Sequence, residues 1–281
     1  MSRSLSDTRT QEQIREHYEI EKSLASRLRN STKQQRETLY SAVYEELFAR
    51  VPHHLMLTRK NSTSLREGAI KRQLAYLNMF LGPDDVFLEI GPGDCALSFT
   101  VAKQVALTFA VDVSETITGN DEQPDNFRLV ISDGTSIPVP ALSISFAYSN
   151  QLMEHLHPDD ATEQLHNVFD ALKPGGRYLC VTPSPLNGPH DISAGFDDTA
   201  TCFHLKEYTV SELATLFRNA GFIDIGVVTG FGGRFFRCPL PVATGAEKLV
   251  RLLPAKWAKA VAGAPLVRNI LYPRIIGTKP V

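Results

Sequence analysis

The chain has 281 residues, of which 43% are hydrophobic and 21% are charged, as in an ordinary folded protein. Its formal net charge of −2 excludes a strong overall field that would attract nucleic acid. The four cysteines are scattered, which argues against a disulfide framework. The first segment is polar, unlike a secretion signal, and no apolar run reaches the length of about 18 residues that a transmembrane helix needs. We therefore expect a cytoplasmic location.

The first 80 residues are predicted to be helical. Apolar residues recur at helical spacing over 11–29 and 33–50, and Pro52 ends the second of these segments. A third helix is predicted over 64–80, before the Gly82-Pro83 pair. Residues 1–80 therefore form a predicted helical extension that precedes the first strand.

Strands are predicted from residue 85 onward. Short apolar runs rich in β-branched and aromatic residues alternate with segments that suit helices, and this pattern predicts a parallel sheet covered on both faces. A helix over 210–220 and two further strands follow. The predicted strands are 86–90, 107–113, 127–132, 144–150, 176–183, 222–228 and 274–279.

The turn after the first strand is the most informative stretch. Gly91 and Gly93 follow the strand directly, and a helix-compatible segment begins near Ala96. Glycines permit a tight turn and let a ligand come close to the backbone. The spacing also fits the dinucleotide fingerprint G-x-G-x-x-G/A with Ala96 last, so a nicotinamide-dependent oxidoreductase is one alternative.

Acidic residues mark three consecutive strand ends. Glu89 lies two residues before the first glycine, Asp112 ends the second strand, and Asp133 follows the third. A single acid of this kind would be read as a solvated loop residue or a helix cap, but three in register predict one cleft at the carboxyl ends of the strands. Glu89 would be unfavourable beside a pyrophosphate and suits a ligand with positive charge, such as the amino acid part of S-adenosylmethionine. Asp112 suits ribose hydroxyls, and Asp133 suits an adenine amine.

Six segments in this order resemble the class I S-adenosylmethionine-dependent methyltransferase superfamily. The segment 146–158 resembles small-molecule methyltransferases of the quinone-biosynthesis type, and the resemblance covers about residues 80–230 with the closing strand. One departure is Cys95, which replaces the third glycine of the first motif. The six segments are 89–94, 111–114, 132–138, 146–158, 171–183 and 207–222.

The resemblance implies a Rossmann-like α/β fold whose seven-stranded sheet has the order 3-2-1-4-5-7-6 and an antiparallel last strand. It implies a methyltransferase domain over 81–281, with S-adenosylmethionine as cofactor and the extension over 1–80 as a lid on the substrate pocket. The residues that it implies for cofactor binding are Glu89, Gly91, Gly93, Asp112, Asp133, Gly134, Asn150 and Gln151.

Two histidines are candidates for a catalytic base. His155 follows the fourth strand, where it could equally cap or pack the next helix, and His190 lies beside Asp191 in a Gly-Pro loop after the fifth strand. Glu154, His155 and His157 resemble part of a metal site in related quinone methyltransferases, but an obvious third carboxylate is missing. We therefore expect no metal.

The C-terminal segment 231–281 carries nine basic residues and one acid, so its net charge is +8. Leucines and a tryptophan interleave with the lysines and arginines over 231–268, which predicts a basic helical insertion before the last strand. This insertion is either a cap with a solvated basic face, a peripheral contact with membrane lipid, or a site for an acidic substrate.

The sequence thus predicts methyl transfer from S-adenosylmethionine to a hydroxyl of a small molecule, such as a sugar, a phenol or quinone-like compound, or a lipid-linked metabolite. The residues Ser149-Asn150-Gln151-Leu152 stand where methyltransferases acting on the amino groups of nucleic acid bases carry an Asn-Pro-Pro-Tyr-like signature, so nucleic acid is not expected as a partner. The alternatives are an NAD-dependent oxidoreductase and a non-catalytic module that binds the membrane surface.

Overall fold

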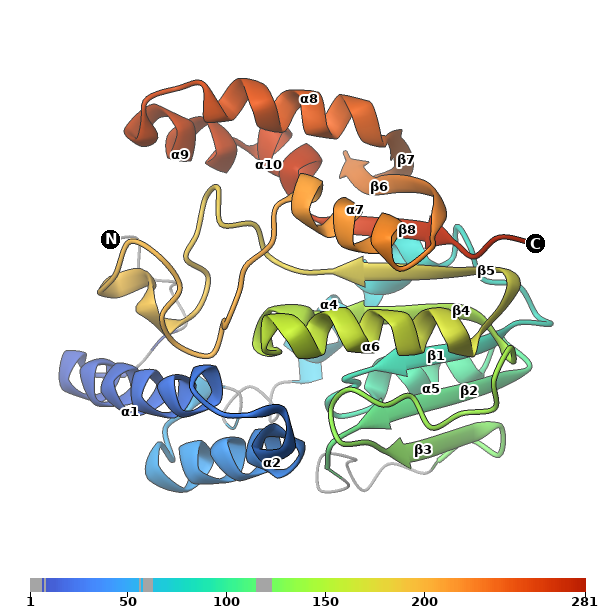
Figure 1. Ribbon diagram of the computed structural model, residues 1–281, viewed down its shortest axis with the longest axis horizontal. Helices are drawn as coiled ribbons and strands as arrows, with labels where there is room; N and C mark the ends of the chain where they lie inside the picture. The colour runs from blue at the N-terminus through green and yellow to red at the C-terminus, as the bar shows by residue number, and fades with distance from the viewer. Residues whose placement is uncertain (1–6, 8, 56, 58–62, 115–122) are drawn as a thin grey trace.

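The computed structural model describes residues 7, 9–55, 57, 63–114 and 123–281 (Figure 1). Within them the chain forms an eight-stranded sheet in the order β3-β2-β1-β4-β5-β8-β6-β7. Neighbouring strands among β1 to β5 pair in parallel, and β8 runs antiparallel to β5 and β6. The carboxyl ends of the parallel strands meet at one edge, called the carboxyl edge below. The strands are β1 (Val86–Ile90), β2 (Leu107–Asp112), β3 (Phe127–Ile131), β4 (Ile144–Asn150), β5 (Leu172–Val181), β6 (Ile223–Phe231), β7 (Arg234–Pro239) and β8 (Arg274–Thr278).

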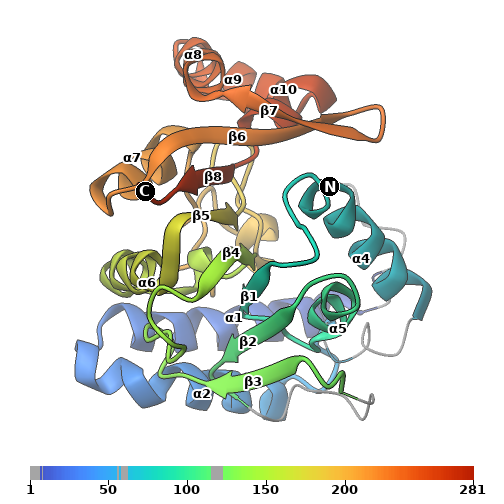
Figure 2. The ribbon, with the colours of Figure 1, turned by 90° about the vertical axis from the view of Figure 1, so that its right-hand side faces the viewer.

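Helices cover both faces of the sheet. Figure 2 shows α6 and α7 on one face and α4 and α5 on the other. Because a strand buried on both faces needs apolar side chains on both, β4 is buried along nearly its whole length and lacks alternation. The helices are α1 (Gln11–Arg29), α2 (Lys33–Arg50), α4 (Thr63–Leu77), α5 (Ala96–Ala102), α6 (Pro158–Ala171), α7 (Val210–Asn219), α8 (Leu240–Arg251), α9 (Ala255–Gly263) and α10 (Pro265–Leu271), with short 3-10 turns η2 (Met153–His155) and η3 (Ile192–Gly195).

The expected strand order is confirmed, and the sheet extends it by one strand. With β8 counted as the seventh strand, the order 3-2-1-4-5-7-6 is present and the last strand is antiparallel. The expectation of a wholly helical insertion over 231–268 is wrong in its first residues, where β7 pairs with β6 as an edge strand. Gly232 and Gly233 have φ of +59° and +81°, which suits the tight two-residue turn of a hairpin.

A buried ion pair joins the N-terminal helices to the domain. Arg36 of α2 donates from Nε and Nη2 to the carboxylate of Asp160 on α6, at 2.6 and 2.7 Å. The hydroxyl of Tyr40 donates to the same carboxylate at 2.7 Å. Burial raises the pKa of Asp160, but these bonds outweigh it and hold the pKa below its ordinary value. Because an unpaired buried charge is costly, the pair favours the docked position of α2.

The predicted extension over 1–80 divides into two parts. Helices α1 and α2 pack on each other, and Leu24 and Leu28 of α1 belong to the main core of the domain. Helix α4 instead packs beside α5, and Figure 2 shows it away from α1 and α2. The predicted extension is therefore not one unit: α1 and α2 form a helical pair, and α4 packs elsewhere on the domain.

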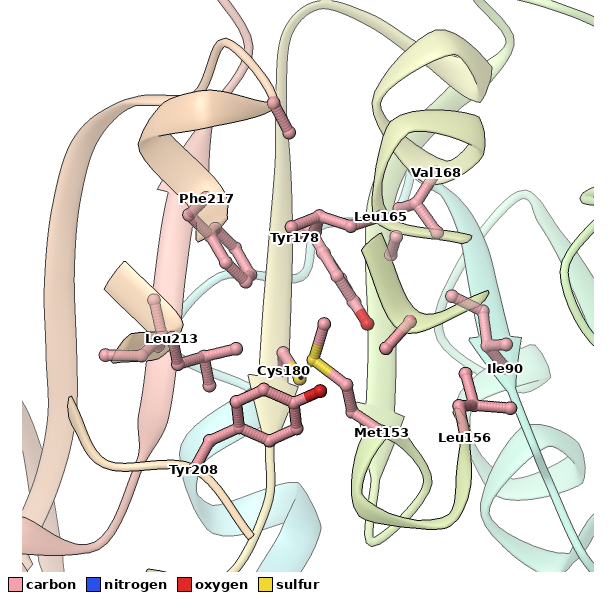
Figure 3. Close-up of a cluster of buried hydrophobic side chains, with 14 of the residues drawn as sticks. Ile90, Met153, Leu156, Leu165, Val168, Tyr178, Cys180, Tyr208, Leu213 and Phe217 are labelled. Atoms are coloured by element: carbon pink, nitrogen blue, oxygen red, sulfur yellow. Dashed lines mark hydrogen bonds between the residues drawn. The ribbon is translucent and has the colours of Figure 1, made fainter. Parts of the chain in front are cut away.

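One core cluster lies between the sheet and helices α6 and α7 (Figure 3), and a second lies between the sheet and helices α4 and α5. Tyr178 of β5 stacks on Phe217 of α7, with ring centroids 5.3 Å apart. The Tyr178 hydroxyl lies 2.7 Å from the hydroxyl of Ser149 on β4, so its polar end has a partner inside the core. Met153 of η2 packs in the same cluster. The segment that follows β4 is thereby fixed at the carboxyl edge.

Candidate functional site

Among the described residues, none fills the space beside Gly93 in the glycine turn after β1. Gly91 and Gly93 have φ of +66° and +59°, a conformation that favours glycine. A Cβ on Gly91 would lie 3.0 Å from the side chain of Leu152, whereas no described atom lies within 4 Å of a Cβ built on Gly93. Cys95 is buried and adopts the same left-handed conformation, with φ of +58°. The turn therefore keeps its shape although the third glycine is replaced.

Glu89 lies buried beneath this turn. Its Oε2 accepts a hydrogen bond from Ser98 Oγ at 2.5 Å. Burial, with smaller contributions from the Asp94 and Asp112 carboxyls, raises the pKa of Glu89 to about 8 against the lowering effect of the Ser98 hydrogen bond. Arg66 pairs with Asp94 at 2.8 Å, so the acidic character here comes mainly from Glu89 and Asp112. These two carboxyl groups favour a ligand with positive charge and disfavour a phosphate.

Asp112 connects the end of β2 to the glycine turn. Its Oδ1 accepts hydrogen bonds from the backbone N–H groups of Val113 and Ser114, at 2.7 and 3.2 Å. Burial raises the pKa of Asp112, and backbone bonds from Val113, Ser114 and Gly93 oppose that rise. The contact with Gly93 shows that two of the predicted cofactor-binding residues meet at the carboxyl edge.

Asp133 is held by its own loop. Its Oδ1 accepts hydrogen bonds from the backbone N–H of Thr135 at 2.9 Å and of Ser136 at 2.7 Å, and from the Thr135 hydroxyl. Burial raises the pKa of Asp133, but these bonds outweigh it and the pKa lies below its ordinary value. The bonds to Oδ1 shape the turn after β3, so Asp133 has a structural role whether or not it also contacts a ligand.

Gly134 lies where α2 approaches the sheet. Its φ is +98°, and a Cβ there would lie 3.2 Å from Cδ2 of Tyr40. We expect Gly134→Ala to lower the free energy of unfolding by about 1–3 kcal/mol, because the left-handed backbone and the contact with Tyr40 both oppose a methyl group. Urea unfolding measures this loss. Gly82→Ala is the matched control, since its Cβ meets only ordinary contacts, and an equal loss in both variants would contradict the argument.

Asn150 and Gln151 end β4 at the same edge. Gln151 is exposed, has φ of +56°, and donates from Nε2 to the Tyr272 hydroxyl at 2.8 Å. Arg274 stacks on Tyr272 with its guanidinium 4.6 Å from the ring centroid. Burial lowers the pKa of Arg274, and its Nη1 has no hydrogen-bond partner among the described residues. The sequence interpretation missed Tyr272 and Arg274. They could have been found from the predicted antiparallel last strand, because such a strand begins at the edge where its parallel neighbours end.

His155 lies in a buried polar cluster with Glu154 and His204. Its Nδ1 lies 3.1 Å from the carbonyl oxygen of Phe203, which makes Nδ1–H the donor and leaves Nε2 as an acceptor. Burial, with a smaller effect of His204, lowers the pKa of His155 to about 3. The rings of His155 and His204 are 4.9 Å apart. His155 is therefore a neutral side chain that can accept a hydrogen bond.

Glu154 is the carboxyl group of this cluster. Its Oε2 accepts a hydrogen bond from Thr182 at 2.8 Å, and its buried Oε1 has no hydrogen-bond partner among the described residues. Burial raises the pKa of Glu154 to about 7, although His204 lowers it. Sequence reasoning considered Glu154 only as a metal ligand, because its burial depends on segments far away in the chain.

His190 lies outside this cluster. Its exposed ring is held at Nε2, 3.1 Å from the carbonyl oxygen of Ser184, and its backbone N–H donates to Glu207 Oε1 at 2.7 Å. The same Glu207 oxygen lies 2.8 Å from Nδ1 of His204. Asp191 does not pair with the His190 ring, because its carboxylate accepts from backbone N–H groups such as that of Ser193. His190 is thus joined to the cluster only through its backbone and Glu207.

Among the described residues, donor atoms of Glu154, His155 and His204 lie within 4.8 Å of one another, close enough to hold a metal ion. His157, the third residue considered from the sequence, instead accepts from the backbone N–H of Asp159 at the start of α6. A second such set, His17 with Glu21 and His54, lies between α1 and the segment after α2. In that set His17 Nε2 already lies 2.7 Å from a Glu21 oxygen.

Comparison with known proteins identifies the domain. A family model described as a methyltransferase domain matches residues 61–225, which is more than half of the chain. Two probable S-adenosylmethionine-dependent methyltransferases from two strains of Mycobacterium tuberculosis are 28% identical over 182 residues, or 63% of this chain. The alignment spans 61% of the length of these relatives.

Solved structures show the same fold. A chain in the complex between the Haloferax volcanii Trm112 methyltransferase activator and its methyltransferase superimposes with a TM-score of 0.53 at 15% identity. The superposition covers 78% of this chain and 96% of that one, and at this identity it supports the fold alone. The chain therefore belongs to the methyltransferase-domain family and has its Rossmann-like α/β fold.

Proposed function

We propose that the protein transfers a methyl group from S-adenosylmethionine to a hydroxyl of a small-molecule acceptor bound at the carboxyl edge. The observation that carries this proposal is the convergence of Glu89 and Asp112 at the turn of Gly93. A cationic ligand offsets the repulsion between these carboxyl groups, whereas the phosphates of NAD would add to it. The same acidic cleft is unfavourable for the phosphates of a nucleic acid.

The residues of the cleft fit this cofactor. Gly93 provides open space beside its backbone, Glu89 provides a carboxyl group for an ammonium, and Asp112 provides a carboxylate for ribose hydroxyls. When bound, S-adenosylmethionine supplies a methyl group on a sulfonium, a good leaving group that keeps the bonding electron pair. The proposed contacts are those of Glu89, Gly91, Gly93, Asp112, Asp133, Gly134, Asn150 and Gln151.

The acceptor proton goes, in this proposal, to the cluster behind the cleft. The acceptor hydroxyl donates its hydrogen bond to Glu154 and loses this proton as its oxygen bonds to the methyl carbon, while the neutral His155, whose Nδ1–H is bound to Phe203, lines the site with Nε2 as an acceptor for another polar group. Glu154 takes the proton, since its pKa of about 7 is close to the operating pH and its Oε1 has no described partner. His190 positions the loop that lies beside this cluster through its bonds to Ser184 and Glu207.

Calorimetric titration of the purified protein with S-adenosylmethionine, and separately with NAD, tests the cofactor assignment. We expect binding of S-adenosylmethionine and none of NAD. Binding of NAD alone would favour the oxidoreductase alternative. Folded protein that binds neither ligand, with or without candidate acceptors, would refute the proposal. A screen of sugar, phenolic and lipid-linked hydroxyl compounds, scored by formation of S-adenosylhomocysteine, then tests the acceptor class.

Asp112→Asn is expected to weaken S-adenosylmethionine binding about ten- to hundredfold. The substitution keeps an acceptor oxygen for Val113 and Ser114 but removes the charge that strengthens bonds to ribose hydroxyls, which is worth about 1.5–3 kcal/mol. Calorimetry at fixed pH measures the change. Asp125→Asn, an exposed acid at the opposite edge before β3, is the control and should bind like the wild type. Equal affinities for all three proteins would remove Asp112 from the site.

A further inference from the structure

The C-terminal helices expose apolar side chains that the fold itself does not use. Leu249, Leu252 and Trp257 are 68%, 82% and 66% exposed. All three lie where α8 ends and α9 begins, in residues 248–259, called the tip below. Helix α8 buries a different face, formed by Ala243 and Val250 among others, against the domain. Large apolar side chains left in water within one short segment indicate a binding surface.

The tip is also strongly basic. Lys248, Arg251, Lys256 and Lys259 are exposed among the apolar residues. The only acid between residues 231 and 281 is Glu247, which is buried and bonded to the backbone N–H of Ser211 at 3.0 Å. Its other oxygen lies 3.2 Å from Arg251 Nε. The exposed charge of the tip is therefore entirely positive, so its complement is an anionic surface with an apolar layer beneath it.

The α8–α10 cluster at the tip also contacts the segment that follows β5. Leu186, in the segment between β5 and His190, packs against the cluster of Val250, Ala262 and Leu271 formed by α8, α9 and α10. Figure 1 shows the turn between α8 and α9 on the same side of the molecule as the arrowheads of β3 and β5, which mark the carboxyl edge. A surface that binds the tip would thus lie on the side of the molecule that the carboxyl edge faces.

We propose that the tip inserts into the headgroup region of an anionic lipid bilayer and turns the carboxyl edge toward the membrane. Leu249, Leu252 and Trp257 enter the boundary with the acyl chains, and the lysines and Arg251 contact the lipid phosphates. Among the described residues, no helix has the length and apolar content needed to cross a bilayer, so this is contact with one leaflet. Where the proposed methyl transfer also holds, the acceptor is a lipid or a lipid-linked molecule.

The single tryptophan of the chain makes the test direct. Trp257 is the only tryptophan among eight tyrosines, so tryptophan fluorescence, excited at a wavelength that tyrosine does not absorb, reports on the tip alone. We expect its emission to shift to shorter wavelength when vesicles of equimolar phosphatidylcholine and phosphatidylglycerol are added. Vesicles of phosphatidylcholine alone should give a smaller shift, and high salt should weaken binding to the anionic vesicles because it screens the lysines and Arg251.

Variants separate the apolar and the charged contributions. Leu249→Ser with Leu252→Ser should weaken vesicle partitioning about tenfold or more, since two exposed leucines lose their burial in lipid. The control is Ile223→Ser, which removes an exposed side chain at the opposite end of β6. Lys256→Gln with Lys259→Gln should weaken binding chiefly at low salt, against Lys173→Gln at the start of β5 as control.

Three results would overturn the proposal. The first is no emission shift with anionic vesicles, and the second is an equal loss of binding in the tip variants and their controls. The third is a shift that appears with rising protein concentration in the absence of lipid, which would assign the tip to a second copy of the chain. Titration of S-adenosylmethionine on the same preparations keeps the two proposals apart, because vesicle binding requires no cofactor.

Discussion

Gly93→Arg is expected to abolish S-adenosylmethionine binding, with a loss of affinity greater than about hundredfold, or about 2.7 kcal/mol. The side chain would extend into space where no described atom lies within 4 Å of the Cβ position, and this space is the proposed cofactor cleft. Calorimetry measures the loss, and circular dichroism confirms that the variant is folded.

Gly93→Ala is the matched control for this prediction. Both substitutions place a Cβ on a residue with φ of +59°, so both carry the same backbone strain of about 1–2 kcal/mol. Only arginine fills the cleft. We expect the alanine variant to keep measurable binding, and equal binding by the arginine variant and the wild type would place the cofactor elsewhere in the molecule.

Glu154→Gln is expected to lower kcat for methyl transfer to a hydroxyl acceptor by about 10²- to 10⁴-fold, the usual contribution of a general base. Because burial raises the pKa of Glu154 to about 7, the wild-type rate should rise with pH through about 7 as the carboxyl group loses its proton. The variant has no ionisable group at this position, so this limb of the pH profile should disappear. Steady-state rates between pH 5 and 9, with an acceptor from the screen, provide the measurement.

Thr182→Val distinguishes a base from a residue that merely supports the fold. Thr182 donates to Glu154 Oε2 and lowers its pKa, so removal of the hydroxyl should move the limb to higher pH while a large part of the maximal rate remains. A Glu154→Gln variant with the wild-type pH profile, or a limb that stays fixed in the Thr182→Val variant, would exclude Glu154 as the proton acceptor.

The parallel sheet was predictable from local patterns, whereas its strand order was implied by the resemblance to class I methyltransferases. The apolar runs and the acids at their ends indicate parallel strands, and parallel strands bring their carboxyl ends together. The hairpin at Gly232 and Gly233 was missed, since β7 is an exposed edge strand whose basic residues obscure its alternation. A pattern that depends on one buried face is weak where neither face is fully buried.

The acceptor side was less predictable, because its chemistry comes from contacts between distant segments. The low pKa of His155 and the raised pKa of Glu154 arise from burial by the segment around Phe203 and His204 and by α1. No local sequence pattern around Glu154 predicts which distant segment buries its side chain. Asp133 is the opposite case, because its hydrogen bonds to Thr135 and Ser136 are local. Its role in the turn could therefore be predicted from the sequence as that of an acidic loop residue.

The docking of α1 has a consequence for the order of folding. Glu21 accepts from the backbone N–H of Phe203, and Arg29 donates to the carbonyl oxygens of Thr201 and His204. These partners are separated by more than 170 residues, so the contacts close one of the longest loops in the chain. During synthesis on the ribosome, α1 emerges well before these partners, which follow β5 in the chain. Helix α1 therefore reaches its native place only after the parallel strands β1 to β5 have been made.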